Sequence, residues 1–127
     1  MMCHDTHGEN QGGHLVARNL VTVIVPLTII VLAIPLILEK VPRNGLYGFR
    51  TAFTMSSDAA WYYANRISGI ALLLAGIFWL ALSRILPAMM HDQRAAYRIV
   101  GLLGAASIIV GCAISYWLAY SRFNNRT

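Results

Sequence analysis

The chain has 127 residues, of which 57% are apolar and only 12% are charged. This length allows one domain at most. The apolar share exceeds the roughly 45–50% of soluble domains, and the charged share is about half of their usual ~25%. A soluble globule of this size leaves much of its surface exposed and cannot hide so much apolar area. The composition excludes intrinsic disorder, a disulfide scaffold and an ordinary soluble enzyme, and predicts a small integral membrane protein.

Ten Lys and Arg residues against five Asp and Glu residues give a net charge of +5. The positive residues flank apolar runs instead of forming a stripe, so they indicate membrane-interface anchors and not a nucleic-acid partner. Cys3 lies in a polar tail and Cys112 in an apolar run, so no disulfide framework is expected. Cys112 is interpreted as a small buried side chain.

Residues 1–19 form a polar tail that is predicted to be disordered, since Gly residues are frequent in it. Its thiol, imidazole and carboxylate groups come from Cys3, His4, Asp5, His7, Glu9 and His14. Imidazole and thiolate suit zinc or copper, but the spacing matches no closed zinc site. We therefore expect no metal and no cofactor, with metal binding by the tail as the alternative.

Three apolar runs follow, at residues 20–38, 67–86 and 99–119. A bilayer core of ~30 Å needs roughly 17–25 helical residues, and backbone amides in lipid must be satisfied within the segment. The first run is longer than the apolar part of a signal peptide and lacks an A-x-A-like site, so it is predicted to span the membrane. Pro26 and Pro35 predict a kink in it. The expected fold is an all-α bundle of three transmembrane helices.

Small residues recur at helical spacing in the second and third runs. Gly69 and Gly76 belong to the second, and Gly104 and Gly111 to the third. Such stripes let helices approach closely, so they predict packing within one bundle, with association between copies as the alternative. Apart from Cys112, and from Arg84 near the end of the second run where it can snorkel, no acidic or basic side chain lies within a predicted span, which argues against a proton- or cation-coupled transporter.

Lys and Arg are distributed unequally between the two predicted sides. One side holds Arg18, Arg84, Arg94 and Arg98; the other holds Lys40, Arg43, Arg50, Arg66, Arg122 and Arg126, the last two in the short basic tail 122–127. The excess favours the first loop and the C-terminus in the cytoplasm and the N-terminus outside. Aromatic residues gather near the helix ends and are interpreted as an interfacial belt.

The segment 41–66 between the first two runs is richer than a connector needs to be. Pro42 is expected to stop the first helix, and Asn44-Gly45 predicts a tight turn because both residues accept positive φ. Gly48 permits a further turn or a close backbone approach. Ser56, Ser57 and Asp58 provide N-caps for a helix running through Trp61 and Asn65. We expect a folded loop.

The candidate site residues all lie in this segment: Pro42, Asn44, Gly48, Arg50, Thr51, Trp61 and Asn65. Arg50 offers a planar fork of donors, and Asn44 can hold a turn or bind a backbone. Two interpretations stay open: these residues fix the loop's own fold, or Arg50, Asn44 and Thr51 contact a partner protein or a lipid headgroup.

The pattern V-P-x-N-x-x-x-G-x-R-T from Val41, followed by Thr54, Ser56, Trp61, Asn65 and Gly69, resembles the signature of the SdpI family. That family is named after an integral membrane protein that gives immunity to a sporulation-delaying toxin. Ala52 stands where members commonly have proline, and the chain resembles only the C-terminal, three-helix half of that protein.

The resemblance implies a non-enzymatic membrane protein that binds a peptide toxin, or holds a cytoplasmic regulator at the membrane. The alternative is an accessory subunit of a larger membrane complex, as a homo-oligomer or with another membrane protein. A small transporter or a lipid-modifying enzyme is less favoured, because no nucleophile–base pair and no charge at membrane depth is present.

Overall fold

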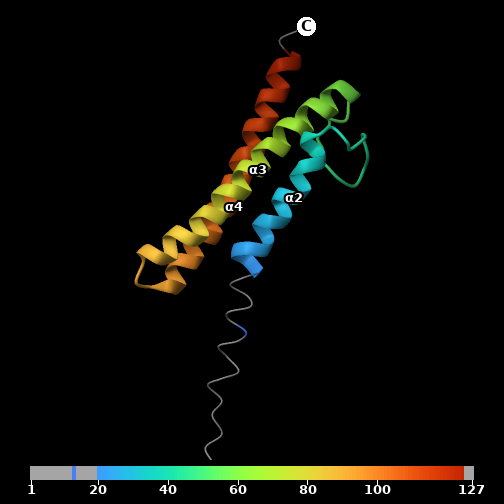
Figure 1. The fold of residues 1–127 in the computed structure, drawn as a ribbon. Coiled ribbons are helices and arrows are strands. Elements are labelled where there is room, and N and C mark those ends of the chain that lie inside the picture. The colour runs from blue at the N-terminus through green and yellow to red at the C-terminus, as the bar shows by residue number, and fades with distance from the viewer. Residues whose placement is uncertain (1–12, 14–19, 125–127) are drawn as a thin grey trace, which may run out of the picture.

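The computed structural model describes residue 13 and residues 20–124 (Figure 1). The predicted tail 1–19 with its Cys and His residues, and Arg126, lie outside the described residues apart from Gly13. The elements are η1 (Leu20–Ile24), α2 (Val25–Ile37), α3 (Asp58–Met89) and α4 (Gln93–Asn124). No strand occurs in the part of the chain that the structure describes. The predicted all-helical class is confirmed.

The first helical segment begins as a π-helix, η1, and continues as α2. Pro26 lies at the junction of the two, in the first turn of α2, and offers no N–H to the preceding turn in η1. The Thr28 hydroxyl donates to the carbonyl of Ile24 at 2.8 Å. The apolar helix in this region, Thr22–Ile37, is shorter than the predicted span 20–38, whereas α3 and α4 are each long and apolar enough to cross a membrane.

α2 ends within one residue of the end of the predicted run 20–38. The helix stops at Ile37, well before Pro42, and Glu39 has a positive φ of 55°. The N–H of Glu39 donates to Leu36 and that of Lys40 to Pro35, at 3.2 and 3.0 Å. These two bonds form a Schellman motif. The turn at Glu39 therefore ends the helix before the chain reaches Pro42.

α3 begins at one of the N-cap residues predicted from the sequence, because the Ser57 hydroxyl accepts a hydrogen bond from the N–H of Ala60 at 3.1 Å. The helix then runs without a break through Trp61 and Asn65 into the apolar run. α3 and α4 have 32 residues each. At ~1.5 Å per residue they are about 48 Å long, which exceeds a hydrocarbon core of ~30 Å.

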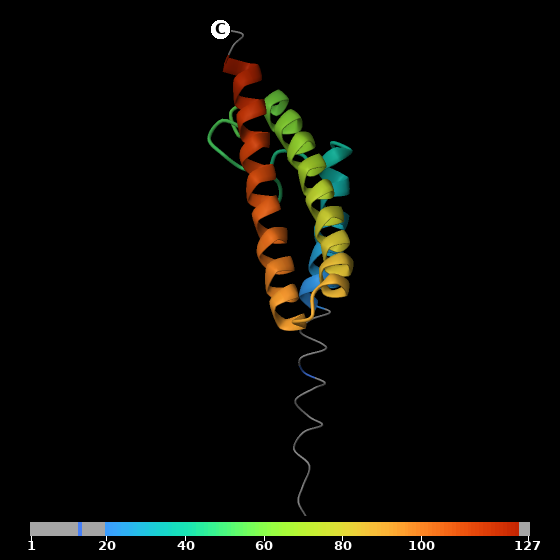
Figure 2. The ribbon, with the colours of Figure 1, turned by 90° about the vertical axis from the view of Figure 1, so that its left-hand side faces the viewer.

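α3 packs against both α2 and α4 (Figures 1 and 2). A Cβ added at Gly69 or Gly76 would lie 2.9 Å from Ile37 or 2.6 Å from Ile30, both on α2. A Cβ at Gly104 would overlap the Trp79 ring, and one at Gly111 would lie 3.2 Å from Ala71. The structure thus places the first two glycines against α2 and the last two against α3.

The outward faces of the long helices are apolar. Only 28% and 17% of the most apolar windows of α3 and α4 are buried. Leu102, for example, is 71% exposed, whereas the core holds small residues such as Ala64, Ala96 and Ala119. A bundle in water has the opposite arrangement, because large exposed apolar patches are rare on soluble monomers.

The two ends of the bundle are distinct. The segment 38–57, the start of α3 and the end of α4 lie together at one end, which we call the loop end (Figure 1). The start of η1 and the short α3–α4 connection lie at the other, which we call the turn end (Figure 2). All candidate residues of the sequence signature lie at the loop end.

Candidate functional site at the loop end

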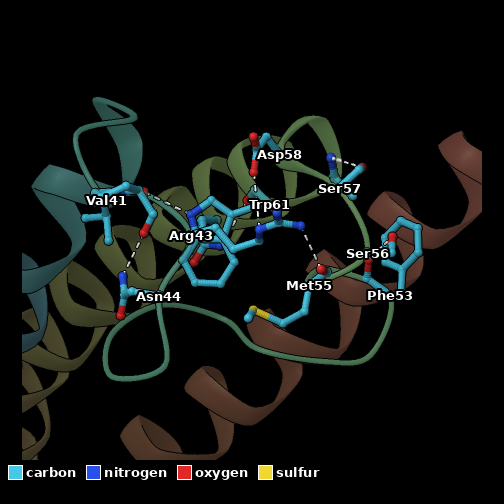
Figure 3. Close-up of polar contacts among 12 residues, drawn as sticks. Val41, Arg43, Asn44, Phe53, Met55, Ser56, Ser57, Asp58 and Trp61 are labelled. Carbon is cyan, nitrogen blue, oxygen red and sulfur yellow. Dashed lines mark hydrogen bonds and ion pairs between the residues drawn. The ribbon is translucent and has the colours of Figure 1, made fainter.

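Two side chains of α3 anchor the loop. Trp61 is fully buried, and its indole N–H donates to the carbonyl of Val41 at 2.9 Å (Figure 3). Asn65 is 2% exposed; its Oδ1 accepts from the N–H of Phe49 at 2.6 Å and its Nδ2 donates to the carbonyl of Trp61 at 2.9 Å. Both side chains thus satisfy polar groups that would otherwise be buried without partners.

Gly48 sits directly over these anchors. Its φ is +116°, and a Cβ at this position would lie 2.6 Å from Oδ1 of Asn65 and 2.9 Å from the Trp61 ring. The expected close backbone approach at Gly48 is confirmed. Gly45, by contrast, does not have a positive φ, since Glu39 and Gly48 alone do among the described residues. The positive-φ turn predicted at Asn44-Gly45 is wrong.

The side chain of Asn44 makes that turn instead. Its Oδ1 accepts from the N–H groups of Leu46 and Tyr47, both at 2.8 Å, and its Nδ2 donates to the carbonyl of Pro42 at 2.7 Å. A short polar side chain that binds its own backbone in this way closes a turn without left-handed residues. The amide of Asn44 is therefore engaged within the loop.

Thr54 closes the second half of the loop. It is fully buried; its hydroxyl donates to the carbonyl of Phe49 at 2.9 Å and accepts from the N–H of Thr51 at 2.8 Å. The Thr51 hydroxyl in turn accepts from the N–H of Thr54 at 3.1 Å. Thr54 stands in the sequence pattern but not among the candidate residues. The reciprocal Thr pair three residues apart is the signal that would have identified it.

Arg43 links the first part of the loop to its last residues and to the start of α3. Its guanidinium donates to the carbonyl of Met55 at 2.9 Å, and its Nε lies 3.2 Å from Oδ1 of Asp58 (Figure 3). From the sequence alone Arg43 contributes only to the charge count, because nothing in the local pattern pairs it with a residue so far along the chain.

Aromatic contacts tie the loop to α4. Phe49 meets Tyr116 edge to face with centroids 6.4 Å apart, and Phe53 meets Tyr120 in the same way at 5.7 Å. Phe123 adds contacts to Phe53 and to Tyr63 of α3. Such pairs stabilise beyond their area by about 0.5–1.5 kcal/mol each. The aromatic residues of α4 therefore also hold the loop in place.

The loop end carries five described cations and two carboxylates, an excess of three positive charges. Arg43 pairs with Asp58, Arg66 with Glu39, and Arg122 lies 4.4 Å from the centre of the Tyr63 ring. The side chains of Arg50 and Lys40 are exposed and make no hydrogen bond or ion pair with any residue in 20–124. Those two cations are available to a ligand.

Below the loop, a half-open groove of about 320 Å³ lies between the three helices. It is lined by Ile29, Leu32, Leu36, Tyr47, Gly48, Phe49, Ser68, Leu72 and Cys112. The Tyr47 hydroxyl donates to the carbonyl of Leu32, and burial raises the pKa of this phenol. The sequence did not predict this groove, because its walls come from segments far apart in the chain.

Within the described residues, no group of three or more His, Cys, Asp or Glu side chains is placed to hold a metal ion. The arrangement that is present is a rigid, cationic loop surface above an apolar groove.

A model of the SdpI/YfhL protein family matches residues 40–121 of the chain. The matched region begins three residues after the end of α2 and includes residues 40–57 of the loop, all of α3 and most of α4. No curated protein and no solved structure matches the chain.

Proposed function

The chain belongs to the SdpI/YfhL protein family, and on this premise we propose that it is an integral membrane protein that acts by binding, without catalysis. Its role would be immunity to a membrane-active peptide toxin, or retention of a regulatory protein at the membrane. The apolar outward faces of α3 and α4 support the membrane location. The cationic loop end supports a cytoplasmic position for the loop and the C-terminus, with the N-terminus outside.

One observation carries the binding role. The loop is fixed by buried side chains, yet Arg50 projects from it exposed and without a partner among residues 20–124. A guanidinium held on a rigid backbone loses little freedom on binding, and its fork suits a carboxylate or a set of carbonyl groups on a partner. Thr51 and Asn44 serve to hold the backbone on either side of it.

The test compares Arg50→Ala with Arg84→Ala, a matched exposed arginine near the turn end. Cells producing each variant are challenged with the toxin, and partners are captured in mild detergent. A charge-assisted hydrogen bond contributes about 1.5–3 kcal/mol, so we expect Arg50→Ala to weaken protection or partner capture by about ten- to a hundredfold. Arg84→Ala retains both, and both variants reach the membrane fraction. Equal behaviour of the two variants would remove the loop from the mechanism.

We do not propose assembly of copies through the glycine stripes. Gly69, Gly76, Gly104 and Gly111 are each in close contact with another helix of the same chain. Those surfaces are therefore not free for a second subunit.

A further inference from the structure

The groove beneath the loop has a composition that suits hydrocarbon. Leu32 and Leu36 of α2, Leu72 of α3 and Cys112 of α4 are among the residues that line it. Apolar cavities of this kind stay dry in water. In a bilayer, a half-open groove between helices is in contact with lipid chains, which fill it without any cost of desolvation.

The polar groups of the groove are already engaged within the chain. The Tyr47 hydroxyl donates to the carbonyl of Leu32, and the Ser68 hydroxyl donates to the carbonyl of Asn65 at 3.1 Å. The side-chain amide of Asn65 is hydrogen-bonded to the backbone of Phe49 and of Trp61. A peptide backbone placed here would leave its own N–H and C=O groups unsatisfied, which is costly. The walls therefore favour an acyl chain over a peptide.

The two available cations lie next to groove residues in the chain. Arg50 follows Phe49, which lines the groove, and Lys40 comes one short turn after Leu36, which also lines it. Both belong to the end with three excess positive charges. A guanidinium and an ammonium at the same end of the groove suit a phosphate diester and are less suited to a zwitterionic headgroup.

We infer that the groove between α2 and α4 binds one acyl chain of an anionic phospholipid, whose phosphate headgroup is held by Arg50 and Lys40. This inference rests on the membrane location proposed above and is independent of toxin immunity.

The first experiment uses Cys112 as a probe in a Cys3→Ser background, where it is the sole thiol. Its reaction with a small apolar maleimide is followed in mild detergent while phosphatidylglycerol or phosphatidylcholine is added. We expect phosphatidylglycerol to slow the reaction by about tenfold at a roughly thirtyfold lower concentration than phosphatidylcholine, since two cations contribute about 1 kcal/mol each. Equal effects of the two lipids, or no effect of either, would overturn the inference.

The second experiment counts bound lipid by native mass spectrometry. Lys40→Ala with Arg50→Ala should lower phosphatidylglycerol affinity about thirtyfold. Cys112→Phe fills the groove and should remove the lipid, whereas Ala113→Phe, at the next and exposed position, should not. Equal lipid retention by the two Phe variants would contradict the groove as the site. If lipid binding fails while Arg50→Ala still loses protection, only this inference falls and the proposed function stands.

Discussion

The loop end and the turn end both join consecutive helices, but with very different amounts of structure. At the turn end, Met90, His91 and Asp92 alone separate α3 from α4. Oδ1 of Asp92 accepts from the N–H groups of Arg94 and Ala95 at 2.9 and 3.2 Å, and the Gln93 amide donates to the carbonyl of Pro87 at 2.7 Å. One cap at each helix end is enough to make this connection.

At the loop end, residues 38–57 separate α2 from α3 and are held by Trp61, Asn65, Asn44, Thr54 and Arg43. Fixing the backbone of each residue costs about 1–2 kcal/mol, so an ordered loop of this length persists only because its contacts offset that cost. The three-residue connection at the turn end shows that two helices can be joined without such contacts. The ordered surface of the loop, with Arg50 on it, is what those residues support.

Replacement of Trp61 is expected to have the largest effect on the stability of the loop end. Trp61→Ala leaves a cavity at a fully buried site and removes the hydrogen-bond donor of the Val41 carbonyl. It should therefore lower the free energy of unfolding by about 3–5 kcal/mol. Trp117→Ala is the control, because Trp117 is 66% exposed on α4. Thermal unfolding in detergent and proteolysis of the loop measure the two effects. A similar loss in both variants would show that Trp61 does not anchor the loop.

Gly48 and Gly45 offer a matched pair within the loop. Gly48→Ala places a Cβ against Asn65 at a φ of +116°, and such strain costs about 1–3 kcal/mol. Gly45→Ala meets nothing within 4 Å and has no positive φ, so its stability should stay close to that of the parent. Proteolysis of the loop with the helical content followed by circular dichroism distinguishes them. Faster cleavage of Gly45→Ala than of Gly48→Ala would contradict the assignment.

Features that depend on a few neighbouring residues were predictable. The cap at Ser57, the helix through Trp61 and Asn65, and the close approach at Gly48 follow from local chemistry, and the structure has all three. The end of α2 was predicted to within one residue, but the motif that makes it was not, because a Schellman motif with a Glu at the left-handed position has no strong sequence signal.

Contacts between distant parts of the chain could not be predicted from local sequence patterns. The bond from Trp61 to Val41 spans 20 residues, and the one from Phe49 to Asn65 spans 16. Arg43 with Asp58, the aromatic contacts to α4 and the groove likewise need the fold before they can be seen. The sequence identified residues that hold the loop without identifying what each one holds.

Removal of the helix cap at the turn end is expected to have the smallest effect, and it tests whether the two ends of the bundle are independent. Asp92→Ala leaves the N–H groups of Arg94 and Ala95 without their side-chain acceptor, and loss of an N-cap costs about 1 kcal/mol. His91→Ala, next to it and exposed, should leave stability unchanged. Because the turn end shares no polar contact with residues 38–57 in the described structure, loop proteolysis and lipid binding should match the parent in both variants. A loop that opens in Asp92→Ala would mean that the two ends are coupled through α3 and α4, and the independence of the loop surface would be lost.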